Sequence, residues 1–129
     1  MRYLQNRTGC TTLPAPDAAP AIGPRSNTET TLIVAGRVFV PTVDVHTFVA
    51  EAKATYPVAA ANPGNILISF CLDDATTGAV AVLEQWASQD ALDRHLSTPE
   101  VTALFTKWAP VMRNEVRKYD AVNERSPRA

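Results

Sequence analysis

Three residues that lie close together in the sequence could carry out acid–base chemistry on an aromatic compound. In the stretch LEQWASQDALDRH, Glu84 precedes Trp86 by two positions and His95 follows it by nine. A carboxylate beside an imidazole fixes the tautomer of the histidine and raises its basicity, which is a common way to build a general base. An indole offers a flat apolar surface with one hydrogen-bond donor, which suits it to stack on an aromatic ring. These residue types predict a catalytic group, provided that the fold brings them into one pocket.

The same residues also have ordinary structural explanations. A single histidine on an apolar helix stripe is usually a satisfied core residue, and a tryptophan in a strand usually packs in the core. Glu84 is less ordinary, because burying an ionised carboxylate is costly unless the carboxylate is paired. Spacing alone therefore leaves both the catalytic and the structural interpretation open.

The chain between residues 30 and 122 alternates between two hydrophobic patterns. Apolar residues at helical spacing predict a helix over residues 42–56, which Pro57 should end or kink. A second helical region begins at Ser88 and restarts at 97–100. β-branched and apolar runs bounded by turn residues predict four strands, at residues 30–40, 65–72, 79–86 and 116–122.

The order strand, helix, strand, strand, helix, strand predicts a fold. It is typical of an α+β protein with the ferredoxin-like βαββαβ fold, in which an antiparallel sheet carries both helices on one face. A single domain of this size has no further element to cover the opposite face of the sheet. A second copy of the chain would cover it, so we expect a homodimer that packs sheet against sheet.

The predicted elements bring the three chemical residues together under one condition. Alternate strand residues face the same side, so Glu84 and Trp86 share a face with Val82. His95 lies on the same helical stripe as Leu92 and should face the sheet. If the strand presents Glu84 and Trp86 to the helices, all three side chains surround one interior pocket.

Neither end of the chain is expected to join this domain. Residues 1–29 indicate an irregular arm, because the segment LPAPDAAPAIGP holds four of the ten prolines and little bulky apolar surface. Residues 123–129 indicate a C-terminal tail. The start MRYLQNR is not followed by the apolar region of a secretory signal, and no apolar run is long enough to span a bilayer. We therefore expect no membrane partner.

Composition argues against several other partners. The net charge is −1, which gives no electrostatic basis for binding nucleic acid. The two cysteines, Cys10 and Cys71, indicate neither a disulfide framework nor a metal-binding spacing. We therefore expect a protein of the reducing cytoplasm that binds no metal.

A set of short motifs gives this sequence a family resemblance. In their order along the chain they resemble the antibiotic biosynthesis monooxygenase (ABM) domain family, and in particular its quinol-monooxygenase-like branch, over residues 31–122. The resemblance implies a ferredoxin-like domain that dimerises as an α/β-barrel, in agreement with the fold predicted from the order of elements. The motifs are the Pro63-Gly64 turn, Glu84-x-Trp86, Ala91-Leu92, and His95 nine residues after the tryptophan.

The resemblance implies a reaction that needs no cofactor. Many members of the family are oxygenases that use neither a metal nor a flavin, and their partners are a small aromatic substrate and molecular oxygen. An electron-rich substrate, such as a quinol or an anthrone, loses a proton and passes an electron from its own anion to oxygen. The protein then has to supply a dry aromatic pocket, a base, and donors for the developing oxyanion.

The resemblance also implies roles for individual residues. His95 would be the base, oriented by Glu84 or by a water molecule, and Trp86 would form the stacking wall. Asn65, directly after the turn glycine, would donate a hydrogen bond to a substrate oxygen, and Arg37 would stabilise an anion. Arg37 could equally serve the surface or a dimer interface. Three aromatic residues would line the pocket or serve as plain core: Tyr56, Phe70 and Trp108.

Two other functions remain open. The anthrone-oxidising branch carries polar residues where this chain has Val82 and Leu92, and the haem-degrading branch carries an axial histidine where this chain has Phe105. A small isomerase or lyase would use His95 for proton transfer and would need further cations in the pocket. A non-catalytic, dimeric ligand-binding domain would tie His95 and Glu84 to backbone groups and leave no cavity.

Overall fold

The computed structural model describes residues 4–5, 11–14 and 30–129. Most of the expected irregular arm therefore lies outside the described residues. Two short strands within it are described, β1 (Leu4–Gln5) and β2 (Thr11–Pro14). β2 is not irregular, because the edge of strand β4 (Asn65–Asp74) offers unpaired backbone groups with which β2 pairs antiparallel.

The pairings of the main sheet are antiparallel. Strands β3 (Thr31–Phe39), β4 and β5 (Ala79–Trp86) lie in the order β4-β5-β3. The C-terminal segment adds β6 (Arg113–Asn114) and β7 (Arg117–Ala121) along β3. All four strands predicted from the sequence are confirmed, with ends within two residues of those expected. β6 escapes the prediction because two residues are too few to show a period.

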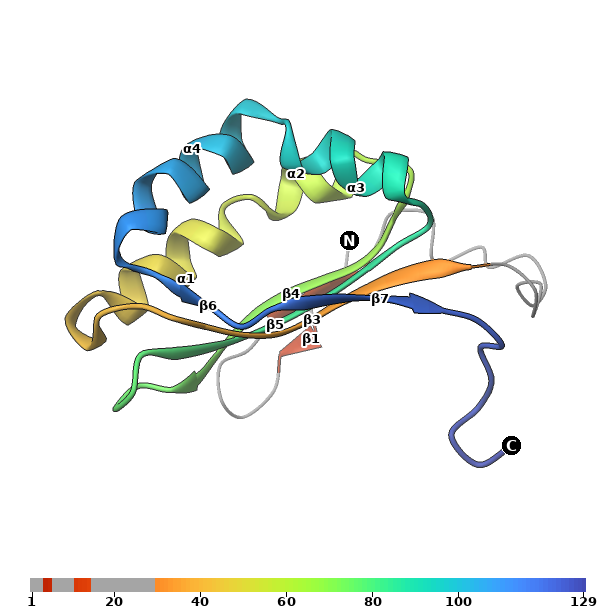
Figure 1. Ribbon diagram of the computed structural model, residues 1–129, viewed down its shortest axis with the longest axis horizontal. Coiled ribbons are helices and arrows are strands. Elements are labelled where there is room, and N and C mark those ends of the chain that lie inside the picture. The colour runs from red at the N-terminus through yellow and green to blue at the C-terminus, as the bar shows by residue number, and fades with distance from the viewer. Residues whose placement is uncertain (1–3, 6–10, 15–29) are drawn as a thin grey trace.

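The helices all cover one face of this sheet (Figure 1). With the strand order above, this arrangement confirms the ferredoxin-like α+β fold. Among the described residues, no helix is long and apolar enough to cross a membrane. The helical elements are η1 (Thr42–Asp44), α1 (Val45–Lys53), α2 (Tyr56–Ala60), α3 (Gln89–Leu96), α4 (Pro99–Trp108) and η2 (Ala109–Val111).

A proline divides the first helical region differently from the expectation. The helix expected over residues 42–56 consists of η1, α1 and the start of α2, and Pro57 lies in the first turn of α2 rather than at a helix end. Proline fits in a first turn because the first N–H groups of a helix have no intrahelical acceptor. The second region does restart as expected, with Pro99 opening α4.

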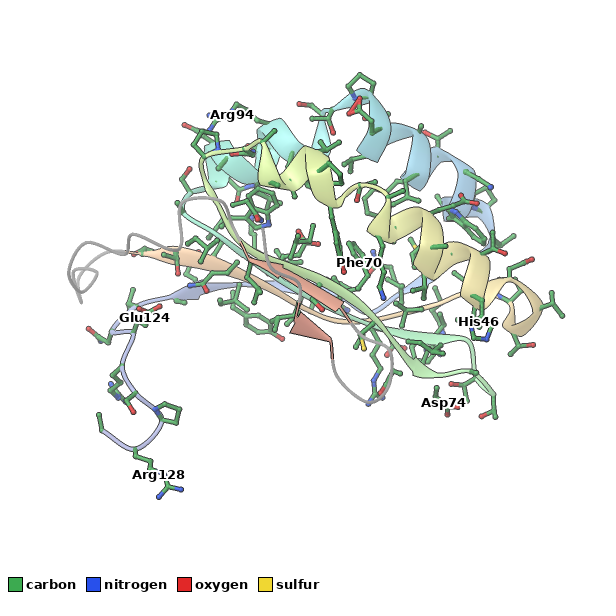
Figure 2. The ribbon with its side chains drawn as sticks, turned by 180° about the vertical axis from the view of Figure 1, so that it is seen from behind. His46, Phe70, Asp74, Arg94, Glu124 and Arg128 are labelled. Carbon is green, nitrogen blue, oxygen red and sulfur yellow. The ribbon has the colours of Figure 1, made fainter. Side chains whose placement is uncertain are left out.

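The core lies between the sheet and the helices, where side chains from both layers fill the space (Figure 2). Burying each large apolar side chain contributes roughly 1.5–3 kcal/mol. This packing holds the helices at a fixed place over the strands that carry the candidate site. The largest fully buried side chains are Val45, Phe48, Ile68, Val80, Trp86 and Val101.

Among the residues that the structure describes, no helix lies on the opposite face of the sheet (Figure 1). Leu83 of β5 faces away from its buried neighbours Val82 and Glu84, because alternate strand residues point to opposite sides. Leu83 is 43% exposed, and Tyr119 of β7 is 55% exposed. The sheet therefore presents large hydrophobic side chains to solvent on this face.

Cys71 of β4 is disulfide-bonded. The expectation that the cysteines build no disulfide is therefore wrong. The argument for a reducing compartment loses its support as well, because disulfides persist mainly in oxidising compartments.

Candidate active site

A buried carboxyl group and a buried indole are joined by a hydrogen bond on β5. The alternation of this strand puts Glu84 and Trp86 on the helix-covered face, where they are 8% and 0% exposed. The indole Nε1–H donates to Glu84 Oε1 over 2.9 Å. Burial raises the pKa of Glu84, and the hydrogen bond from Trp86 partly opposes that rise. The carboxyl group of Glu84 is thus desolvated, and the hydrogen bond from Trp86 holds it in one orientation.

Glu84 opens onto an apolar cavity of about 320 Å³ between the sheet and the helices. This volume lies at the lower end of the range for small-molecule pockets. Glu84 is the one acidic residue among the described residues that line it. Most of the wall is formed by aliphatic and phenylalanine side chains, namely Val34, Val38, Phe48, Phe70, Val82, Leu92, Leu96, Phe105 and Val116. The other polar lining residues are Gln89, Asn114 and Lys118.

His95 contacts Trp86, which in turn contacts Glu84. The imidazole of His95 packs on Trp86 with 4.7 Å between ring centroids, and Nδ1 is buried without a hydrogen-bond partner among the described residues. Burial lowers the pKa of His95 to about 4. The expected carboxylate–imidazole pair is absent from the described hydrogen bonds, because Glu84 takes its hydrogen bond from Trp86.

His95 also differs from Glu84 in the space that it lines. It does not line the apolar cavity, but a more open hollow of about 540 Å³ between α2, α3 and α4, with Arg94 and Glu100 among the other lining residues. The structure therefore brings Glu84, Trp86 and His95 into contact in series. It does not gather them around one space.

Two other polar candidates lie away from the cavity. Asn65 is buried, and its Nδ2 donates to the carbonyl of Leu67 over 3.2 Å. The guanidinium of Arg37 is exposed on the uncovered side of the sheet and forms an ion pair of 2.8 Å with Asp73. Of the two roles that the sequence left open for Arg37, this position fits the one at the surface. Alternation along a strand groups residues by face without showing which face the helices cover.

The three aromatic candidates divide into one lining residue and two supporting residues. Phe70 lines the cavity. Tyr56 packs against Phe70 with 6.4 Å between ring centroids, and its hydroxyl accepts from the Phe70 amide over 2.8 Å. Trp108 packs edge-on against Phe48, another lining residue, with 5.2 Å between ring centroids. Tyr56 and Trp108 thus hold the lining rings in place from behind.

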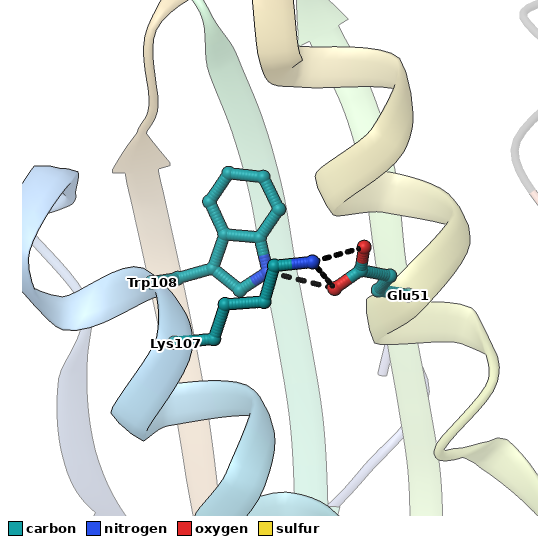
Figure 3. A network of polar contacts seen from close by, with 3 residues as sticks. All are labelled: Glu51, Lys107 and Trp108. Carbon is teal, nitrogen blue, oxygen red and sulfur yellow. Dashed lines mark hydrogen bonds and ion pairs between the residues drawn. The ribbon is translucent and has the colours of Figure 1, made fainter.

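A polar network at the surface fixes Trp108. Its Nε1–H donates to Glu51 Oε1 over 3.1 Å, and the ammonium group of Lys107 contacts the same carboxylate (Figure 3). Glu51 comes from α1 while Lys107 and Trp108 come from α4. The network therefore ties together α1 and α4, two of the three helices that line the cavity.

Sequence analysis missed the polar residues at the C-terminal side of the cavity. Lys118 of β7 and Gln89 of α3 both line it, and the Lys118 ammonium donates to Gln89 Oε1 over 2.5 Å. The signal for Lys118 was present, because Val116 and Lys118 alternate along one face of a predicted strand. Only the pairing of β7 with β3 turns that face towards the cavity.

Comparison with known proteins establishes the family. The model of the antibiotic biosynthesis monooxygenase family matches residues 31–107, which is more than half of the chain. The chain belongs to this family. No curated protein matches it. Among the described residues of this ABM protein, no three His, Cys, Asp or Glu side chains form a group that could hold a metal ion.

Solved structures agree with the ABM fold. A candidate antibiotic biosynthesis monooxygenase from Nitrosomonas europaea has a TM-score of 0.62 and 11% identity, over 77% of this chain and 94% of that one. Another from Caulobacter crescentus has a TM-score of 0.61 and 22% identity, over 76% and 92%. A conserved protein from Methanosarcina mazei has a TM-score of 0.60 and 16% identity, over 76% and 96%. At such identities the likeness shows the fold alone.

The ABM match does not include every wall of the cavity. It ends at residue 107, whereas Asn114, Val116 and Lys118 line the cavity from beyond that point. Glu84 and Trp86 lie within the matched region. The carboxyl group thus belongs to the part shared with the family model, and the lysine belongs to the segment after it.

Proposed function

We propose that this ABM protein is a monooxygenase that oxidises a quinol, an anthrone or a similar polycyclic phenol with molecular oxygen and without a cofactor. The observation that carries the proposal is a single buried carboxyl group opening onto an apolar cavity. Such a cavity admits an aromatic ring, and its mostly apolar wall offers few hydrogen-bond partners to water. Family membership supports an oxygenase reaction.

Glu84 is the proposed base. Its desolvation raises the pKa, which makes the ionised form a stronger base than an exposed carboxylate. The N–H of Trp86 keeps the carboxyl group oriented, and the low polarity of the walls favours proton transfer to it over solvation by water.

The proposed reaction balances without another oxidant. In the keto form of a polycyclic phenol, one ring carbon carries two hydrogens. Glu84 removes one as a proton, the resulting anion transfers an electron to O₂, and recombination of the radical pair forms a carbon–oxygen bond. Loss of water, which takes up both hydrogens and the second oxygen atom, leaves a carbonyl group on the ring.

His95, the base expected from the sequence, takes a positioning role in this proposal. Its pKa of about 4 keeps the imidazole neutral at pH 7, and its ring contacts the indole of Trp86. Its Nδ1 is buried and His95 does not line the cavity. His95 would therefore support the orientation of Trp86, which in turn holds Glu84.

Oxygen uptake tests the proposal directly. Chelator-treated protein is mixed with anthrone or 1,4-dihydroxynaphthalene, and uptake above the autoxidation rate is compared for wild type, Glu84→Gln and the control Glu100→Gln on α4. We expect Glu84→Gln to lower the rate by about a hundredfold, the range of a general base. Glu100→Gln should leave the rate unchanged. Labelled O₂ should place one atom in the product.

The alternative of a non-catalytic ligand-binding domain has one observation in its favour. The carboxyl group of Glu84 already accepts a hydrogen bond, as it would in a purely structural role. Binding of the aromatic compounds without oxygen uptake in wild type would establish this alternative. Uptake that is equal in wild type and Glu84→Gln would remove Glu84 from the reaction.

The proposed protein assembles as a homodimer. A homodimer would cover the sheet face that exposes Leu83 and Tyr119. The cytoplasmic location predicted from the sequence remains a prediction, and the disulfide at Cys71 argues for an oxidising compartment instead.

A further inference from the structure

The cavity carries a second charged residue, Lys118, whose side chain is exposed at the rim. In the sheet register, Val34 of β3 pairs with Glu84 of β5 on one side and with Lys118 of β7 on the other. All three residues line the cavity. Because neighbouring strands lie about 4.8 Å apart, the α-carbons of Glu84 and Lys118 are separated by roughly 10 Å across Val34.

Lys118 has no carboxylate partner in the described part of the chain. The ion pairs found there are Arg37–Asp73, Lys107–Glu51 and Arg113–Glu115. Lys118 instead donates to Gln89, a neutral amide, and Gln89 in turn donates to Asp93 over 2.8 Å. A charge-assisted bond to a carboxylate is stronger than a bond to a neutral acceptor, so an anion in the cavity would compete well for this ammonium group.

The space between the two charged residues is apolar. Val34 forms its floor, and Leu92, Leu96 and Phe105 of the helices line the same cavity. A ligand that fills it must therefore have an apolar, flat middle. One end of the ligand would lie next to the carboxyl group of Glu84, and the other end would lie next to the ammonium group of Lys118.

We propose that Lys118 determines substrate specificity by binding an anionic substituent, so that the substrates are aromatic hydroxy acids with the hydroxyl group and the carboxylate at opposite ends of a fused ring. The placement of the hydroxyl-bearing ring, which contains the reacting carbon, next to Glu84 rests on the proposed function. The anion site at Lys118 does not, because it depends only on the cation and the apolar cavity. Since β7 lies beyond the family match, this selectivity is a property of the C-terminal segment of this chain.

Equilibrium binding tests the proposal without any reaction. Calorimetric titration of the full chain compares 6-hydroxy-2-naphthoate with 2-naphthol, which lacks the carboxylate, and with 3-hydroxy-2-naphthoate, which carries it next to the hydroxyl group. We expect the 6-hydroxy acid to bind about tenfold more tightly than either, the range for a bond to a charged group. Lys118→Gln should abolish this preference, and Lys118→Arg should retain it.

Arg117→Gln is the matched control, because Arg117 is the neighbouring cation on β7 and faces the opposite side of the sheet. This variant should keep the preference, and circular dichroism should show that all three variants fold. Equal affinities in wild type, an unchanged preference in Lys118→Gln, or no binding of any ligand would overturn the inference. A preference for the carboxylate without oxygen uptake would refute the oxygenase proposal and would still support the anion site at Lys118.

Discussion

Burial acts in opposite directions on the two ionisable residues that flank Trp86. It raises the pKa of Glu84 and lowers the pKa of His95 to about 4, because in each case the low-polarity surroundings disfavour the charged form. In both cases the folded state loses stability when the residue becomes charged. His95 lowers stability when it must take up a proton, and Glu84 lowers it when it must lose one.

The contribution of His95 to stability should depend on pH. The unfolded chain binds a proton at His95 below its ordinary pKa of 6.5, whereas the folded chain binds it only near 4. Stability from this group is therefore present above pH 6.5 and is lost as the pH falls towards 4. In urea unfolding, His95→Gln should lose less stability than wild type between pH 7 and pH 4.5. The control His46→Gln, at an exposed histidine on α1, should behave like wild type.

Replacing the indole should change the acid limb of the rate profile. Trp86→Phe removes the hydrogen bond that lowers the pKa of Glu84 and leaves the desolvation that raises it. Under the proposed function, the acid limb of kcat/KM in oxygen uptake should move to higher pH. Trp108→Phe, which removes an indole N–H directed at Glu51, is the matched control. An acid limb that stays in place in Trp86→Phe would show that another group titrates.

At the scale of the elements, the turn before β4 fixes α3 against the sheet. Asn62 Nδ2 donates to the carbonyl of Ala91 in α3 over 2.9 Å, and Asn62 Oδ1 accepts from the amide of Gly64 over 2.9 Å. A β-carbon at Gly64 would collide with the β-carbon of Ala91. The glycine is needed here for close approach, because its φ is not in the left-handed region.

Gly64→Ala should therefore destabilise the fold by pushing α3 away from β4. The expected loss is about 1–3 kcal/mol, as for other overpacked positions. The free energy of unfolding in urea measures it. The double variant Gly64→Ala with Ala91→Gly removes the atom that is struck, so its loss should be smaller than the sum of the two single losses. Strict additivity would show that this contact is not the cause.

At the scale of the whole molecule, the asymmetry of the sheet sets the expected assembly. The helices of the described residues all cover one face (Figure 1), and the other face exposes Leu83 and Tyr119. Large apolar side chains on an uncovered face usually mark an interface. The proposed homodimer would bury them.

Leu83→Lys should disrupt that dimer. A lysine on each copy would place like charges in an apolar interface, which is costly in both desolvation and repulsion. Light scattering after size exclusion should show a shift from dimer to monomer. Val43→Lys, at an 88% exposed position in η1, is the control and should keep the wild-type mass. A wild-type protein that is monomeric at all concentrations would refute the dimer itself.

The order of elements and the grouping of residues by face can be read from the amino-acid sequence alone. Periods of two and of about 3.6 residues are local properties, so they place β5 at 79–86 and group Glu84 with Trp86. The prolines that interrupt the helical regions are also visible in the sequence, although Pro57 lies in the first turn of α2 rather than at a helix end. These features follow from neighbours along the chain.

Contacts between residues far apart in the chain cannot be read in this way. Alternation does not show which face of β3 the helices cover, so it leaves the place of Arg37 open, and the structure puts its guanidinium at the surface. It could not show that the indole stands between Glu84 and His95, since that depends on rotamers chosen by packing. Lys118 reaches the cavity because β7 pairs with β3, a contact between segments far apart in sequence. Long-range pairing and side-chain packing leave no local period in the sequence.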